Sequence, residues 1–177
     1  KGKPKAEGAG KGYAYPISNP NVMEAHIFQL KKDIPAELGG GVMWLSVGSP
    51  RNAPYLPYLG NISKTYKAYQ EKSTKYNDKS WYWTVSHINE LVAAHPKQFG
   101  TKVIDEMKDL EKNWIAEQDQ TNKELSQLVQ TDPAAAQEKA DTVSLARAEK
   151  TFKRLKAIEA KLVKESGEKA SSKNTKS

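Results

Sequence analysis

The pattern of hydrophobic residues in the first third of the chain predicts two strands joined by a glycine-rich turn. Residues 22–30, VMEAHIFQL, favour a strand with Ile27 and Phe28 on opposite faces. Residues 42–47 are almost continuously apolar, which is typical of a strand buried on both faces. About a dozen residues separate the two segments, so we expect an antiparallel pair. Because two strands alone are not stable in water, this pair needs a covering layer.

Three prolines after the second strand predict a stiff loop with one arginine inside it. Pro50, Pro54 and Pro57 exclude a helix and lack backbone donors, so we expect no ladder hydrogen bonds here. Ligand sites tend to lie at strand exits in layered folds, and a guanidinium can hold a carboxylate through two parallel hydrogen bonds. Arg51 is therefore the leading candidate for a functional residue, against the alternative of a solvated surface arginine.

The second half of the chain has helical periodicity. Ser80 is a good N-cap for a helix that ends before His95-Pro96, because the residue before proline avoids helical geometry. A longer helix follows, with a polar gap in its apolar stripe, and Asp132-Pro133 predicts the start of another. The apolar positions are Trp81, Val85, Ile88 and Val92, then Val103, Met107, Leu110, Trp114, Leu125 and Leu128, then Leu145, Ala148, Phe152, Leu155 and Leu162. The last two stripes predict an antiparallel helical hairpin, and the fold class is α+β, with antiparallel strands covered by long helices.

Composition divides the chain into a body and two charged ends. We expect a flexible linker or loop at 1–21, a folded part at 22–130, a helix packed on it at 131–165 and a disordered tail at 166–177. The net charge of +7 comes mostly from six lysines against two glutamates in 1–32 and four lysines against two glutamates in 164–177. Because nucleic-acid binding needs a basic stripe on a folded face, we expect no nucleic-acid partner. We also expect no membrane span, since no apolar run approaches the roughly 20 residues it would need.

The residue types that carry most catalytic and metal chemistry are sparse. The absence of cysteine excludes disulfides, zinc–thiolate sites and a cysteine nucleophile within this chain. His26, His87 and His95 do not have metal-ligand spacing, so we expect no metal and no cofactor. Ser46 and Ser49 have no evident base to activate them.

Three segments together resemble a known family. EAHIFQL at 24–30, PAELGGGVMWLSVGSPRNAPYLPYLGNI at 35–62 and SWYWTVSHINELV at 80–92 are similar to the C-terminal part of the C69 (formerly U34) dipeptidases of Gram-positive bacteria. The similarity extends over roughly residues 21–130. Its specific elements are a histidine-bearing strand, a glycine turn, a W-L-x-x-G-S-P-R strand exit and a tyrosine–proline loop.

This resemblance implies the C-terminal portion of an N-terminal-nucleophile hydrolase with a four-layer αββα sandwich. Such an enzyme uses a cysteine at its mature N-terminus, whose α-amino group, with a pKa of about 8, serves as base. Since this chain has no cysteine, the resemblance implies that the nucleophile lies in an N-terminal part of the same protein, which becomes a partner of this segment. The implied substrate is a dipeptide. Arg51 would contact its carboxylate or stabilise the transition state, with Asn52 and Asn61 as weaker candidates for substrate contacts.

Alternatives remain at this point. The chain could be a non-catalytic helical module for cell-surface interaction or spacing, built on helices 97–165. The sequence leaves open a homo-oligomer and either a cytoplasmic or an exported, cell-surface location in a Gram-positive bacterium.

Overall fold

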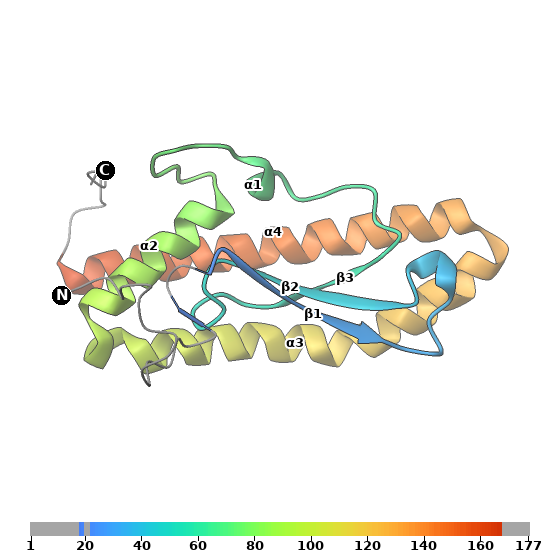
Figure 1. Ribbon diagram of the computed structural model, residues 1–177, viewed down its shortest axis with the longest axis horizontal. Coiled ribbons are helices and arrows are strands. Elements are labelled where there is room, and N and C mark those ends of the chain that lie inside the picture. Colours follow the sequence, from blue (N-terminus) through green and yellow to red (C-terminus); the bar gives the residue numbers. More distant parts are fainter. Residues whose placement is uncertain (1–17, 20–21, 168–177) are drawn as a thin grey trace, which may run out of the picture.

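Three antiparallel strands in the order β1–β2–β3 form the sheet in the computed structural model, which describes residues 18–19 and 22–167. The strands are β1 (Glu24–Leu30), β2 (Gly41–Val47) and β3 (Leu56–Leu59), with the short helix η1 (Ala36–Leu38) between the first two. The helices are α1 (Lys67–Gln70), α2 (Trp81–Ala94), α3 (Pro96–Thr131) and α4 (Pro133–Ser166). The predicted α+β class is confirmed: the sheet lies along one side of a long helical hairpin, and α2 covers one end (Figure 1).

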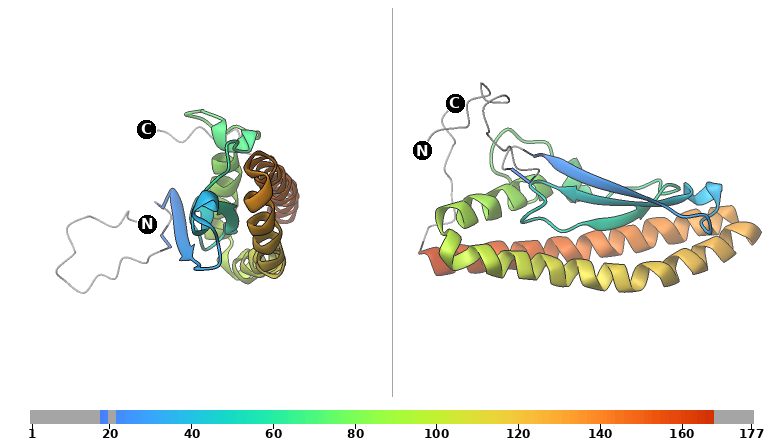
Figure 2. Two further views of the ribbon diagram at one scale, coloured as in Figure 1. Left: turned by 90° about the vertical axis from the view of Figure 1, so that its right-hand side faces the viewer. Right: turned by 60° about the horizontal axis from the view of Figure 1, so that its bottom comes forward.

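The predicted helix boundaries are confirmed. The Ser80 hydroxyl accepts a hydrogen bond from the Trp83 amide at 3.5 Å, and His95 ends α2. Asp132 accepts from the Ala135 amide at 2.9 Å, with Pro133 as the first residue of α4. The helices α3 and α4 run side by side in opposite directions, as the two views of Figure 2 show.

A buried polar layer explains the polar gap in the stripe of α3. Arg147 of α4 is 6% exposed and donates to Gln118 Oε1 at 2.6 Å and to Thr121 Oγ1 at 2.9 Å. Gln118 in turn donates to Asn122 Oδ1 at 2.7 Å. Burial of the guanidinium lowers the pKa of Arg147, and the negative charge of Glu117 opposes this effect. The hairpin is therefore closed by hydrogen bonds at the point where apolar contacts are missing.

The loop predicted after β2 is partly a strand, so the prediction of a non-laddered loop is wrong. Residues 56–59 pair with β2, with Leu59 opposite Val42 and Pro57 opposite Trp44. Pro57 is tolerated because β3 lies at the edge of the described sheet, where a missing amide donor removes no second ladder. The following turn packs closely: a Cβ on Gly60 would lie 2.8 Å from Gly39 Cα, so glycine is required there.

The sheet is less buried than the apolar run of β2 predicts. Met43, Trp44 and Leu45 are only half-buried, so β2 is not covered on both faces. In β1, Ile27 is 55% exposed and Phe28 is 64% exposed, on opposite faces as expected. One sheet face rests on the helices, while the outer part around β1 projects away from them (Figure 2).

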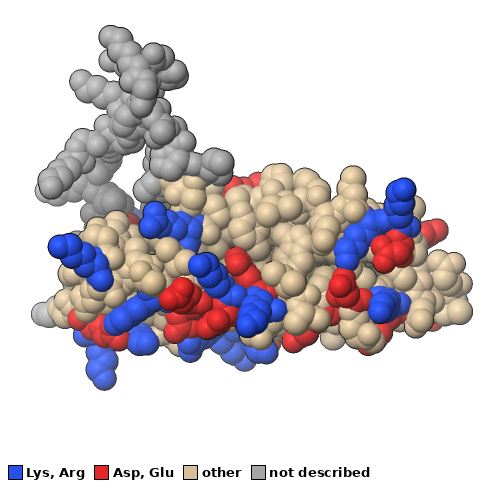
Figure 3. All heavy atoms as spheres, turned by 90° about the horizontal axis from the view of Figure 1, so that it is seen from below, with Lys and Arg blue, Asp and Glu red and all other residues tan. Residues whose placement is uncertain are grey.

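The ends of the chain lie almost wholly outside the described residues. The predictions of a linker at 1–21 and a disordered tail at 166–177 therefore stay predictions. Within the described ranges, no helix is long and apolar enough to cross a membrane. Along the face viewed from below, acidic and basic side chains are interspersed, so this face carries no single-sign patch (Figure 3).

Candidate functional site at the exit of β2

A tight turn holds Arg51 directly after β2. The Asn52 amide donates to the Ser49 carbonyl at 3.1 Å, which closes a β-turn with Pro50 and Arg51 at its central positions. Proline is favoured at the first of these positions because its φ angle is already correct. The buried Ser46 hydroxyl donates to the Ala53 carbonyl at 3.2 Å and fixes the turn to the strand. The arginine is thus presented by a constrained backbone.

Gly48 allows this turn to pack on α2. Its φ angle is +99°, and a Cβ there would lie 2.5 Å from Val85 Cγ1. Its amide donates to the Met23 carbonyl at 2.6 Å, which ties the exit of β2 to the start of β1. Any side chain at this position would therefore displace the turn from the helix.

Arg51 and Asn52 line a pocket of about 720 Å³ between this turn and α2. Pockets of this volume are typical of small-molecule sites. The Arg51 side chain is exposed and forms no hydrogen bond or ion pair with any described residue. From α2 the lining includes Tyr82, Ser86, Asn89, Glu90 and Ala93.

Asn52 is the buried polar residue of this pocket. It is 6% exposed, and its Nδ2 donates to Asn89 Oδ1 at 2.7 Å. Its own Oδ1 is buried without a hydrogen-bond partner. A buried carbonyl without a donor among the described residues is costly, so Asn52 is held in place by its bond to Asn89 and not by its oxygen.

Asn61 does not share this pocket. It follows β3 where Leu59 pairs with Val42 at the start of β2, whereas Arg51 follows the end of β2. Nearby, Asp141 of α4 accepts from the Ser63 amide at 2.7 Å and from the Ser63 hydroxyl at 2.6 Å, so this segment is anchored on the helix. Burial raises the pKa of Asp141, but these hydrogen bonds outweigh it and lower the pKa overall. The predicted substrate contact of Asn61 stays a prediction.

The histidines have positions in keeping with structural roles. His87 is buried and lies 2.8 Å from Glu159 Oε1, while His26 packs against the Phe28 ring. Among the described residues, no three His, Cys, Asp or Glu side chains are grouped as a metal site would need.

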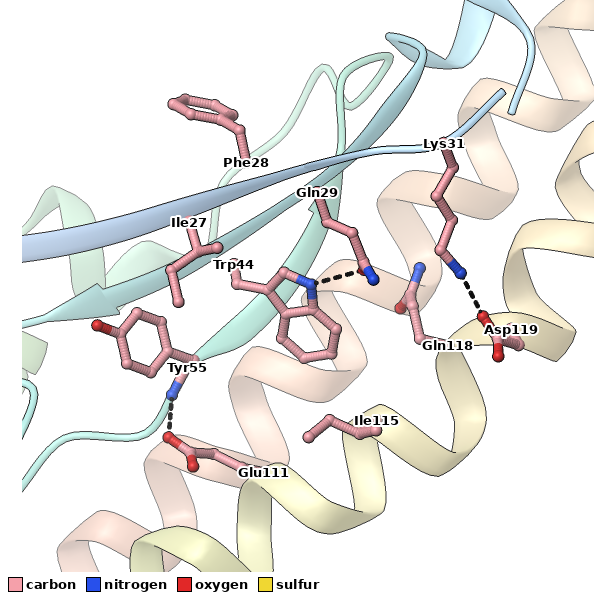
Figure 4. A pocket seen from close by; sticks show the side chains of 10 residues that line it. All are labelled: Ile27, Phe28, Gln29, Lys31, Trp44, Tyr55, Glu111, Ile115, Gln118 and Asp119. Atoms are coloured by element: carbon pink, nitrogen blue, oxygen red, sulfur yellow. Dashed lines mark hydrogen bonds and ion pairs between the residues drawn. The ribbon is translucent and has the colours of Figure 1, made fainter. Parts of the chain in front are cut away.

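A second cleft, of about 560 Å³, separates β1 and β2 from α3 (Figure 4). We call it the β1–α3 cleft. Ile27, Trp44 and Ile115 form its apolar lining, and the Lys31–Asp119 ion pair at 2.6 Å lies at one end. Glu111 accepts from the Tyr55 amide at 3.0 Å, and its pKa is raised by burial despite this bond. The Trp44 indole donates to Gln29 Oε1 at 3.2 Å.

The α2 wall of the Arg51 pocket was missed by sequence reasoning. A signal for it exists, because Tyr82, Ser86, Asn89 and Ala93 recur at steps of four, three and four along the helix. This spacing puts them on one face, beside the apolar stripe that starts at Trp81. What the sequence does not contain is the contact between Asn52 and Asn89, which are far apart in the chain.

Comparison with known proteins defines the family. A sequence model of peptidase family C69 matches residues 4–109, which is more than half of the 177 residues. The chain therefore belongs to peptidase family C69, as the resemblance predicted. The match begins well before residue 21, so it includes most of the segment predicted as a linker.

Several relatives carry dipeptidase names. The chain is 87% identical over 165 residues to "Probable dipeptidase B" of Streptococcus pyogenes serotype M3, covering 93% of this chain and 33% of the relative. It is 31% identical over 94 residues to "Probable dipeptidase" of Latilactobacillus sakei, which is 53% of this chain and 20% of the relative. It is 35% identical over 78 residues to "Dipeptidase A" of Lactobacillus helveticus, which is 44% of this chain and 15% of the relative. The chain thus spans about a third of the length of the streptococcal relative.

Proposed function

We propose that this chain is the C-terminal part of a cysteine dipeptidase and supplies one wall of its active site. The observation that carries the proposal is the Arg51 turn, which lies inside the family match and lines a pocket of about 720 Å³. The names of the streptococcal and lactobacillar relatives support a dipeptide as substrate.

The proposed chemistry is acyl transfer to a cysteine at the mature N-terminus of the whole enzyme. Its neutral α-amino group accepts the thiol proton, and the thiolate sulfur attacks the carbonyl carbon of the dipeptide amide. The C–N bond breaks, the leaving amine takes up the proton, and a thioester remains. Water then attacks the thioester, which releases the acid and restores the thiol.

Arg51 contributes a fixed positive charge to this site. A guanidinium stays protonated at all working pH values and can bind a carboxylate through two parallel hydrogen bonds. At the exit of β2 it can hold the substrate carboxylate or stabilise the oxyanion formed during attack. Asn52 lines the same pocket and is the second residue proposed to contact the substrate.

The rest of the enzyme would cover the sheet. Apolar side chains around β1 are unusually exposed, with Phe28 at 64% and Leu30 at 82%. Exposed apolar surface of this kind marks an interaction site. In the proposed enzyme, the N-terminal part packs on this face as the second sheet of an αββα sandwich.

The test is hydrolysis of dipeptides by the full-length protein, followed by thiol alkylation. The proposal predicts activity that is lost when the N-terminal cysteine is alkylated or replaced by alanine. Rapid quenching with a slow substrate is expected to trap a thioester of the protein. Full activity after complete alkylation would contradict the cysteine mechanism.

The rival, a non-catalytic helical module, has less support. An alignment of 165 of the 177 residues with a protein named as a dipeptidase leaves only 12 residues unmatched, far fewer than the helical hairpin contains. The helical hairpin thus belongs to the same relative as the Arg51 turn, and α4 contacts β3 directly.

A further inference from the structure

One acidic residue, Glu90, faces the same pocket as Arg51. Glu90 is an exposed residue of α2 that lines the pocket, and its side chain forms no ion pair or hydrogen bond with any described residue. Arg51 is likewise without a partner within the described chain. The pocket therefore holds two charges of opposite sign that are not paired with any described residue.

We propose that Glu90 binds the protonated α-amino group of the substrate while Arg51 binds its carboxylate. The inference rests on the proposed dipeptidase function and assigns a specificity-determining residue to it. A free dipeptide is a zwitterion at neutral pH, with an ammonium group at one end and a carboxylate at the other. A pocket with one fixed cation and one fixed anion is complementary to that charge pattern.

A hydrogen bond joins the two segments that carry the charged residues. Asn52 and Asn89, the sequence neighbours of Arg51 and Glu90, are joined by the 2.7 Å bond from Nδ2 to Oδ1. This bond connects the turn after β2 to the middle of α2. The two charged residues thus lie on two walls of the pocket that are joined at one point.

The pocket has further groups for the substrate between its charged ends. Tyr82 and Ser86 of α2 supply polar lining. Val92, Ala93 and Pro96 supply apolar lining in which a substrate side chain can lie. These contacts do not depend on the α-amino group, which makes the contribution of Glu90 separable.

The experiment compares two substrates on the full-length enzyme: an alanyl dipeptide and its propionyl analogue, which lacks only the α-amino group. Glu90→Gln is expected to lower kcat/KM for the dipeptide about tenfold, as for loss of one charge-assisted hydrogen bond, while the propionyl analogue changes less than about twofold. Glu90→Asp should restore part of the preference, since it keeps the charge. Glu138→Gln, an exposed residue of α4 outside the pocket, is the matched control.

The outcomes separate this inference from the proposed function. If the wild-type enzyme cleaves dipeptides but Glu90→Gln changes both substrates equally, or neither, the assignment of Glu90 is wrong and the dipeptidase proposal stands. If the wild-type enzyme neither binds nor cleaves dipeptides, both are wrong. Equilibrium binding of the dipeptide to an enzyme with its nucleophile replaced gives the same comparison without turnover.

Discussion

The helical hairpin and strand β1 differ in how far their apolar side chains are buried. Phe99, Leu125 and Leu155 of the hairpin are 0% exposed, whereas Ile27, Phe28 and Leu30 of β1 are 55%, 64% and 82% exposed. Both regions carry apolar residues in their sequence. Within the described residues, other elements cover those of the hairpin, whereas those of β1 stay exposed.

This contrast indicates which side of the molecule the rest of the proposed enzyme would cover. The chain spans about a third of the length of its streptococcal relative. The hairpin is held by the Asp132 cap of α4 and by the buried Arg147 layer. The Arg51 pocket lies between the two regions, with one wall on α2 and one at the exit of the partly covered strand β2. In the proposed enzyme, the hairpin and α2 support one wall of the active site, and the rest of the protein supplies the nucleophile.

The largest difference is expected between two phenylalanines. Phe99→Ala in α3 should lower the free energy of unfolding by about 3–5 kcal/mol, because it leaves a cavity in a packed core. Phe28→Ala in β1 should change it by less than about 0.5 kcal/mol in the 177-residue chain, since the ring is exposed. Urea denaturation of both variants measures the difference. Equal losses of unfolding free energy in the two variants would contradict the difference in burial between hairpin and strand.

A second test asks whether β1 becomes buried in the whole enzyme. Phe28→Glu should leave the stability of the 177-residue chain nearly unchanged but destabilise the full-length protein by about 2 kcal/mol or more, because a charge would then be buried. Thermal unfolding of both lengths, with Glu37→Gln as a surface control, gives the comparison. An equally small loss of stability at both lengths would contradict the proposal that the N-terminal part packs on β1.

A smaller, pH-dependent effect is expected where α2 meets α4. Glu159 is buried, and burial alone would raise its pKa. Hydrogen bonds from three side chains outweigh this effect and lower the pKa below the ordinary 4.5. The donors are His87, Lys156 and Tyr76. A carboxylate with a depressed folded-state pKa stabilises the fold above its unfolded pKa and loses this contribution as pH falls through the folded value. Glu159→Gln should therefore cost about 1–3 kcal/mol at neutral pH.

The measurement is the difference in the free energy of unfolding between wild type and Glu159→Gln, which we call the stability gap, from about pH 6 to pH 3. The gap should stay constant at the upper end and shrink below pH 4.5 as the carboxylate is protonated. A gap that widens with falling pH would contradict the assignment of a charged Glu159.

Local signals in the sequence predict much of the fold. Ser80 and Asp132 fall at the helix starts they predict, because capping depends only on the residue and its next turn. The prolines misled the prediction of β3, since Pro57 fits an edge strand as well as a loop. The Arg147 layer could not be predicted, because the partners in α3 come together only when the hairpin closes.

The candidate site is predicted only in part for the same reason. The Gly48–Asn52 turn is a local feature, and its proline and glycine fix its geometry. Its pairing with α2 depends on a contact between Asn52 and Asn89 that no local pattern contains. Asn61, grouped with Arg51 by chemistry alone, lies at the other end of β2. Residue type identifies candidates for a site, while tertiary contacts decide which of them meet.

The most direct test of the account is the kcat/KM of the full-length enzyme with Arg51 replaced by alanine, beside Arg154→Ala as a surface control. We expect Arg51→Ala to lower kcat/KM by about 100-fold, through a higher KM if the guanidinium only binds substrate and through a lower kcat if it stabilises the transition state. Arg154→Ala should retain nearly full activity. Wild-type kinetics for Arg51→Ala in a folded enzyme would contradict the placement of this turn in the active site.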